Sequence, residues 1–493
     1  MNEARKWWPR RGVRAFGPVA IVIAAALLAG CATNPVTGRR EFSLVSAQQE
    51  AQMGREGYPA VVAEYGIYED STTQRYVEGV GRKLAKVSHL PDLDWHFTVI
   101  DDPSVNAFAM PGGYIYVTRG ILAHLNSEAQ LAGVLGHEIG HVTHRHSASQ
   151  ISRQQLAGIG LGVASVLSPT AARYGQVAQQ ALGLMFLKYS RDHENEADQS
   201  GVDYATRAGY EPNEIPPTYA MLKRVGERAG QRLPGFLSTH PDPGDREVRT
   251  TELARAAREG KTGLLVRRDQ YLMGLDGMVF DNDPRGGYFE GDEFYHPAFA
   301  FLMTFPAGWK RENSHAAVIA SPGGQVGMQL TLADAEDLSP GDYVAKLQGS
   351  GRIAGSRGAA ERIAGLSAWV GRIAVAGEGG SERILAAAFI RRGPGRMIQI
   401  VGASAAPDDT DFRKVLASAR SFRPLTDPAR LAPTPARVQV TRVARAGTFA
   451  ATVEALGAQA LDLDATAILN NRDPAEVVGV GDRVKTVIPA RLR

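Results

Sequence analysis

The pentapeptide His137-Glu138-Ile139-Gly140-His141 constrains this chain of 493 residues more than any other stretch. In an α-helix, residues four positions apart lie on one face, one turn above the other. Two imidazoles at this spacing can bind one metal ion, while Glu138 reaches the open side of that ion. A helix start is indicated by Ser127-Glu128-Ala129-Gln130, a capping-box pattern followed by apolar residues at helical spacing. We therefore expect a metal site on a helix that begins near residue 127.

The segment Glu194-Asn195-Glu196-Ala197-Asp198 offers a third metal ligand. Glu194 and Asp198 share a helix face, so one can bind the metal while the other accepts the free ring N–H of a ligating histidine. Glu196 points elsewhere on such a helix and is the weaker candidate. The alternative is an acidic helix start that is solvated and favoured by the helix dipole. The H-E-x-x-H spacing favours the metal site, because zinc hydrolases use it with the glutamate as general base.

Two further histidines follow this motif. His144 shares the face of His137, but seven residues place it about 10.5 Å further along the helix axis, too far for the same mononuclear site. His146 falls on the opposite face. We expect neither residue to be a ligand.

The first thirty residues have the pattern of a secretory signal, with a basic start and an apolar run over residues 19–29. Leu28-Ala29-Gly30-Cys31 is similar to a bacterial lipobox, and Cys31 is the single cysteine of the chain. We expect residues 1–30 to be a lipoprotein signal peptide, Cys31 the lipidation site and residues 31–45 a tether. A plain signal peptide or an N-terminal membrane anchor is the alternative. Without residues 1–30 the chain has 50 basic and 51 acidic residues, a balance that indicates no nucleic-acid partner.

The segment 105–118 contains two β-prone runs around Pro-Gly-Gly, which predicts a hairpin. The strands are either ordinary core strands or the border of the metal cleft. In the second case, an extended peptide would pair with the strand containing Asn106, Ala107, Phe108 and Ala109.

The motifs H-E-I-G-H, E-N-E-A-D and N-A-F-A-M-P-G-G-Y-I-Y-V-T-R-G together resemble peptidase family M48, in particular its periplasmic lipoprotein branch of BepA-like proteases. The resemblance covers about residues 34–257. It implies one zinc ion per chain, with Glu138 as general base and Asp198 supporting a ligand. The implied zinc ligands are His137, His141 and Glu194. It also implies a regulatory or transition-state contact for His240 and Arg246.

The predicted fold class is α+β, with three folded parts. Residues 46–263 form a mainly helical zincin domain of the gluzincin type with a small sheet, and residues 264–423 an α+β accessory domain. A Pro-rich linker at 424–436 precedes residues 437–493, which resemble a divergent LysM-like module. That resemblance implies contact with peptidoglycan; a solubilising or protein-binding module is the alternative.

The function expected from these features is a zinc endopeptidase that hydrolyses misfolded or stalled envelope proteins. Its location would be the periplasm. By resemblance to lipoprotein sorting in Gram-negative bacteria, the absence of Asp after Cys31 favours a lipid anchor in the inner leaflet of the outer membrane. One alternative is a periplasmic chaperone or assembly factor for outer-membrane proteins, with proteolysis secondary. A protein with a purely structural metal site is a further alternative, against which the retained Glu138 argues.

Overall fold

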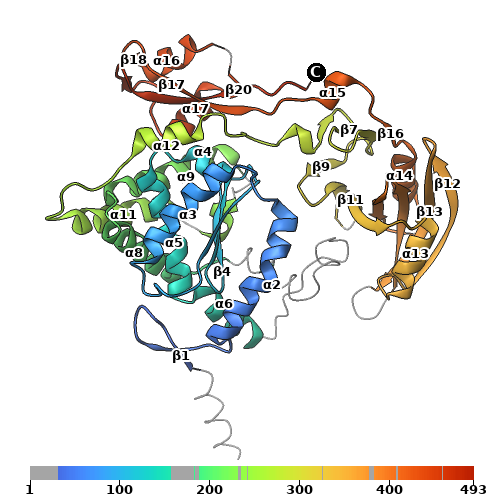
Figure 1. The fold of residues 1–493 in the computed structure, drawn as a ribbon, viewed down its shortest axis with the longest axis horizontal. Helices are drawn as coiled ribbons and strands as arrows, with labels where there is room; N and C mark the ends of the chain where they lie inside the picture. The colour runs from blue at the N-terminus through green and yellow to red at the C-terminus, as the bar shows by residue number, and fades with distance from the viewer. Residues whose placement is uncertain are drawn as a thin grey trace, which may run out of the picture.

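The computed structural model describes residues 31–156, 183, 188–230, 235–240, 243–324, 326–376, 382–406, 409–457 and 459–492. It contains both helices and sheets, as the α+β prediction requires, in an N-terminal domain, a middle domain and a C-terminal module (Figure 1). The expected signal peptide at residues 1–30 lies outside the described residues.

The N-terminal domain is mainly helical. Its helices are α2 (Ala47–Tyr65), α3 (Ser71–Ala85), α4 (Arg119–His124), α5 (Glu128–Thr143), α6 (His146–Leu156), α8 (Arg191–Arg207), η1 (Pro212–Glu214), α9 (Pro216–Ala229), α10 (Gly235–Thr239) and α11 (Pro243–Arg258). The helix start predicted at Ser127 is confirmed, because its side chain accepts a hydrogen bond from the backbone N–H three residues later, and Ser46 caps α2 by the same contact. Ser190 caps α8 in the same way.

Three strands form the small sheet of this domain in the order β3 (His96–Ile100), β5 (Tyr114–Thr118), β4 (Ala107–Met110). β3 runs parallel to β5, whereas β4 pairs antiparallel with β5 and lies at the edge. The predicted hairpin is thus confirmed. Its turn requires glycine at Gly112, since φ is +82° and a Cβ there would lie 2.7 Å from the backbone of Ala51.

Helix α5 runs through the apolar core and touches α8 backbone to backbone. A Cβ on Gly136 would lie 2.9 Å from the carbonyl oxygen of Gly201, and one on Gly140 would lie 3.0 Å from Cα of Ala197. The close approach therefore depends on glycines within and beside the two predicted metal-binding motifs. It brings the two motifs face to face.

Residues 31–45, for which the sequence predicts a tether, contain β1 (Cys31–Thr33) and β2 (Arg40–Phe42) as an antiparallel pair. The segment contacts the N-terminal domain through side-chain hydrogen bonds. Asn34 Nδ2 donates to the carbonyl oxygen of His144 at 3.3 Å, and Leu44 N donates to Ser152 Oγ at 2.8 Å.

The middle domain contains a seven-stranded sheet in the order β12-β13-β14-β15-β11-β10-β9 and a four-stranded sheet in the order β16-β8-β7-β6, both antiparallel. Its elements are η2 (Pro284–Gly286), β6 (Tyr288–Glu290), β7 (Glu293–His296), β8 (Phe301–Thr304), β9 (Lys310–Asn313), β10 (Val318–Gly323), β11 (Val326–Glu336), α13 (Pro340–Gly349), β12 (Gly355–Ile363), β13 (Leu366–Ala376), β14 (Glu382–Arg391), β15 (Gly395–Ala403), α14 (Thr410–Arg420) and β16 (Arg423–Pro424). Helix α12 (Arg268–Leu275), which precedes them, packs instead on the apolar cluster of the N-terminal domain that includes α5. Within its described residues no cluster of potential metal ligands occurs.

The C-terminal module packs on the N-terminal domain beside α4 and α9, where Figure 1 shows its red elements above the helices. After α15 (Pro428–Leu431), its elements are β17 (Arg437–Arg442), β18 (Gly447–Thr448), α16 (Phe449–Ala455), α17 (Leu463–Asn470), β19 (Val477–Val478) and β20 (Arg483–Ile488). Ile468 and Leu469 belong to the apolar cluster that includes α5. Buried Lys485 donates from Nζ to the carbonyl oxygens of Ala123 (2.6 Å) and Leu125 (2.7 Å). None of the helices in the described ranges has the length and hydropathy needed to cross a bilayer.

Candidate metal centre

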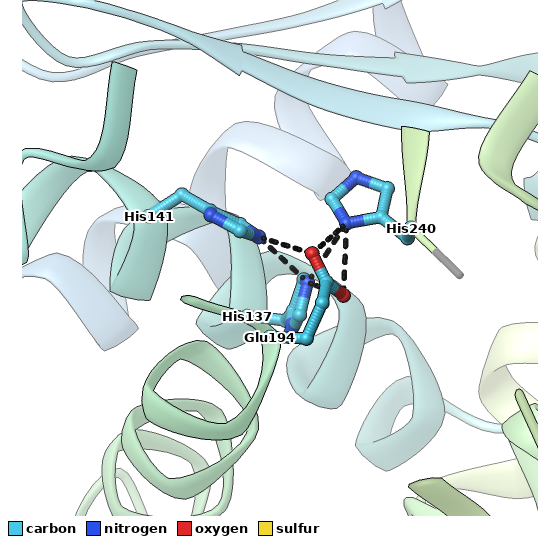
Figure 2. Close-up of side chains that lie close together, drawn as sticks. All are labelled: His137, His141, Glu194 and His240. Atoms are coloured by element: carbon cyan, nitrogen blue, oxygen red, sulfur yellow. Dashed lines mark hydrogen bonds and ion pairs between the residues drawn. The ribbon is translucent and has the colours of Figure 1, made fainter. Parts of the chain in front are cut away.

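Four buried side chains converge on one point between α5, α8 and the end of α10 (Figure 2). His137 and His141 approach each other through their Nε2 atoms, which are 3.0 Å apart. Glu194 Oε1 lies 3.5 Å from His141 Nε2, and its Oε2 lies 3.7 Å from His137 Nε2. His240 is the fourth member. Two imidazole nitrogens and one carboxylate are a donor set that zinc prefers.

The protonation states of these groups suit a metal ion. Burial, together with the neighbouring His137, holds the pKa of His141 well below its usual 6.5, so its imidazole is neutral. Burial alone would raise the pKa of Glu194, but the charges of His240 and Arg246 outweigh it and lower the pKa to about 2. Neutral imidazoles and ionised carboxylates are the forms that bind metals.

Glu138 lies at the same point and is fully buried. Neither of its carboxylate oxygens has a hydrogen-bond partner among the described residues. Burial raises the pKa of this carboxyl group above its usual 4.5. Because buried polar atoms are almost always paired, these two orphaned oxygens fit a site that a metal ion and a water molecule complete.

A buried ion-pair network holds His137 and Glu194 in position at the metal centre. His137 Nδ1 lies 3.0 Å from Asp198 Oδ1, and Arg246 contacts both Asp198 and Glu194. Tyr219 donates from its hydroxyl to Asp198 Oδ1 at 2.7 Å, and Arg249 Nη2 lies 2.5 Å from Asp198 Oδ2. Burial alone would raise the pKa of Asp198, but Arg246 and His137 hold it well below the usual value. Sequence analysis missed Tyr219 and Arg249, which belong to no recognisable motif.

His240 faces the ligands from the end of α10. Its Nδ1 lies 2.9 Å from Glu194 Oε1 and 3.3 Å from His137 Nε2, while its Nε2 lies 3.8 Å from Glu138 Oε1. Two aromatic rings hold the imidazoles in place. Phe236 stacks on His240 with centroids 4.4 Å apart, and Tyr189 stacks on His141 at 3.9 Å.

The prediction that His146 lies on the opposite face of the metal-binding helix is wrong. Helix α5 ends at Thr143, and His146 begins α6 instead of continuing the same helix. The turn between the helices brings His146 Nδ1 to 2.9 Å from His141 Nδ1. His144, His146 and Glu196 form a second group whose potential ligand atoms lie within 4.8 Å of one another.

The segment expected to bind substrate, residues 106–109, overlaps β4 (Ala107–Met110) at an edge of the small sheet. Asn106 Oδ1, in the residue before this strand, is buried and has no hydrogen-bond partner among the described residues. The side chains of Ala107, Phe108 and Ala109 are buried, so only the backbone of this edge could pair with another chain.

Comparisons with known proteins agree with this site. Residues 71–253, which contain both motifs, match the model of peptidase family M48. The mitochondrial metalloendopeptidase OMA1 of Schizosaccharomyces pombe is 34% identical over 217 residues, which cover 42% of this chain and 61% of the relative. The beta-barrel assembly-enhancing protease of Escherichia coli strain K12 is 30% identical over 234 residues, which cover 45% of this chain and 47% of the relative.

This chain therefore spans only about half to three fifths of the length of these two relatives. The matched segment includes α5, α8 and His240, but it excludes the middle domain and the C-terminal module. On the motifs, the geometry and these matches, the chain carries a peptidase domain of family M48.

Proposed function

We propose that this protein is a zinc-dependent endopeptidase of the bacterial cell envelope that hydrolyses peptide bonds of misfolded or stalled envelope proteins. The supporting observation is the convergence of His137, His141 and Glu194 beside the orphaned carboxylate of Glu138. The name of the Escherichia coli relative, a beta-barrel assembly-enhancing protease, supports the choice of envelope substrates.

His137 and His141, through Nε2, and Glu194, through its carboxylate, would hold one zinc ion. When bound, zinc lowers the pKa of a water molecule toward neutrality and polarises the scissile carbonyl group. Glu138 takes the proton of the attacking water and passes it to the leaving amine. Burial raises the pKa of Glu138, which makes this carboxylate a stronger base than an exposed one.

The substrate would bind as an extended strand against the free edge of β4, with Asn106, Ala107, Phe108 and Ala109 as the pairing segment. Backbone hydrogen bonds would supply the affinity in this mode of recognition. The edge position of β4 and the unpaired Oδ1 of Asn106 support this assignment.

His240 would regulate the enzyme by serving as a fourth ligand. Its Nδ1 lies close to both Glu194 and His137, so in this position it competes with the water that hydrolysis needs. Movement of the short helix α10 would then activate the site. Arg246 is engaged with Asp198 and Glu194, which supports a role in fixing ligands rather than in contacting the transition state.

The envelope location would depend on lipidation of Cys31 and insertion into the outer membrane from the periplasmic side. Residues 437–493 would contact peptidoglycan if they act as a LysM-like module. Their strand-helix-helix-strand arrangement, in which β17 and β20 pair antiparallel around α16 and α17, supports a compact unit of that kind.

The rival function is a chaperone or assembly factor in which proteolysis is secondary. Replacing Glu138 with Gln separates the two, because the amide cannot act as a base but has nearly the same shape. We expect Glu138→Gln to lose cleavage of an unfolded substrate such as β-casein, to keep zinc and to fail in cells. Full cellular function without cleavage would favour the chaperone.

A further inference from the structure

His141 is the first member of a chain of three hydrogen-bonding side chains that leads away from the metal centre. Its Nδ1 lies 2.9 Å from Nδ1 of His146, and Nε2 of His146 lies 3.0 Å from Oε2 of Glu196. His141 and His146 are buried, whereas the side chain of Glu196 is 41% exposed. These three side chains thus form a relay of hydrogen bonds that runs from the metal centre to a solvent-exposed carboxylate.

The turn between α5 and α6 places the imidazole ring of His146 next to that of His141. Arg145 adopts a left-handed conformation with φ +58°, which reverses the direction of the backbone after α5. Its guanidinium group is held by α2 and the segment just before it, because Nε lies 2.9 Å from Glu50 Oε2 and Nη2 donates to the carbonyl oxygen of Val45 at 2.8 Å. This ion pair is largely buried. The position of His146 is therefore determined by contacts with a segment about a hundred residues earlier in the chain.

We propose that His146 and Glu196 are positioning residues that fix the tautomer and orientation of His141. The proposal rests on the proposed function, because it assumes that His141 binds zinc through Nε2. A histidine that gives Nε2 to a metal carries its proton on Nδ1, and the partner of that proton controls the ring.

One arrangement of protons satisfies all three groups. His141 Nδ1–H donates to Nδ1 of His146, so the proton of neutral His146 is on Nε2. That Nε2–H then donates to the carboxylate of Glu196. His137 reaches its carboxylate directly, through the 3.0 Å contact between Nδ1 and Asp198 Oδ1, whereas His141 reaches one through an intervening imidazole. Two residues of the E-N-E-A-D motif other than the ligand Glu194 thus each support one histidine ligand.

The ring of His146 is held firmly enough for this role. His193 stacks on it with centroids 4.3 Å apart and an angle of 12° between the planes. His141 meets it edge-on, at 5.0 Å and 73°. The ring cannot turn away from His141 without losing both contacts.

A second metal site formed by His144, His146 and Glu196 is the competing interpretation. It requires Nε2 of His146 to be free of its proton, so that His146 would donate from Nδ1 to His141. His141 would then carry its own proton on Nε2 and could not bind the catalytic metal. In addition, the rings of His144 and His146 are stacked nearly parallel, at 17°, with centroids 5.2 Å apart. The relay and a second metal on His146 therefore exclude each other while His141 is a ligand.

The test compares zinc affinity, by chelator competition, and the visible spectrum of the cobalt-substituted protein in matched variants. His146→Phe keeps the stacked ring but removes both nitrogens, and we expect it to weaken zinc binding about ten- to hundredfold and to shift the cobalt bands. His146→Asn keeps an acceptor near the position of Nδ1, so part of the affinity should return. His144→Phe is the control, because the Nε2 of His144 bonds to Ser200 Oγ outside the relay, and it should change affinity less than twofold.

Wild-type affinity and an unchanged spectrum in His146→Phe would overturn the proposal. A second zinc ion in the wild type that both His144→Phe and His146→Phe remove would also overturn it, in favour of the second site. If His146→Phe does not fold, Glu196→Ala decides, since Glu196 is partly exposed: a severalfold loss supports the relay, and no loss contradicts it. A wild-type protein that binds no zinc would refute the proposed function instead.

Discussion

Arg246 and Asp198 form a bidentate ion pair in which both side chains are buried. Arg246 Nε lies 3.0 Å from Asp198 Oδ2, and Nη2 lies 2.6 Å from Oδ1. The third nitrogen of the guanidinium group, Nη1, lies 2.6 Å from Oε2 of Glu194. One cation thus compensates both the carboxylate that supports His137 and the carboxylate expected to bind zinc.

Replacing Arg246 with Ala should therefore destabilise the protein strongly. It leaves the charges of Asp198 and Glu194 buried without their main partner, which costs about 3–5 kcal/mol. Urea unfolding of the metal-free protein measures this loss. Arg207→Ala is the matched control, because Arg207 forms only an exposed pair with Asp203, worth about 0–1 kcal/mol. Equal losses in the two variants would contradict the buried network.

The metal-free protein should lose stability as the pH falls below 6.5. Burial holds the pKa of His141 and of His146 well below 6.5, so these histidines stay neutral when folded but bind protons when unfolded. Their stabilising contribution is therefore complete above pH 6.5 and declines below it, by about 1 kcal/mol per histidine per pH unit. Denaturant midpoints in EDTA at pH 7.5, 6.5 and 5.5 measure this decline. A pH dependence that is unchanged in His146→Phe would argue against the assignment to these side chains.

His240→Ala should increase cleavage of an unfolded substrate severalfold and weaken zinc binding. The reason is that the variant removes a fourth ligand and frees the position that water needs. Initial rates at saturating zinc measure the effect, with the exposed His315 replaced by Ala as the control. Lower activity in His240→Ala with intact zinc binding would instead assign His240 to the transition state.

Asn106→Ala should raise KM for peptide substrates and leave kcat nearly unchanged. Asn106 Oδ1 has no hydrogen-bond partner among the described residues and lies just before the edge strand, so a bound peptide could pair with it, whereas the proton transfer is assigned to Glu138. Steady-state kinetics separate the two constants, and exposed Asn282→Ala serves as control. A fall in kcat with constant KM would contradict a role in substrate binding.

The parts of the site that could be predicted from sequence depend on local spacing. The helix start at Ser127 and the pairing of Glu194 with Asp198 on one face follow from the geometry of a single helix. Likewise, the Pro-Gly-Gly turn follows from the backbone freedom of Gly112.

What could not be predicted depends on contacts between distant segments. A helical wheel places His146 away from the metal, because it cannot foresee that the backbone turns at Arg145, whose side chain is held by Glu50. Tyr219 joins the site only because α11 packs against both α9 and α8, and its hydroxyl group reaches Asp198 on α8. The docking of Lys485 onto the carbonyl oxygens near α4 joins segments more than 350 residues apart, and no local pattern encodes it.

The number of zinc ions bound per chain, in the wild type and in His137→Ala, tests the central claim most directly. We expect one tightly bound zinc ion in the wild type and none in His137→Ala, with His144→Phe retaining one. One zinc ion bound to His137→Ala with undiminished affinity would contradict the assigned metal centre.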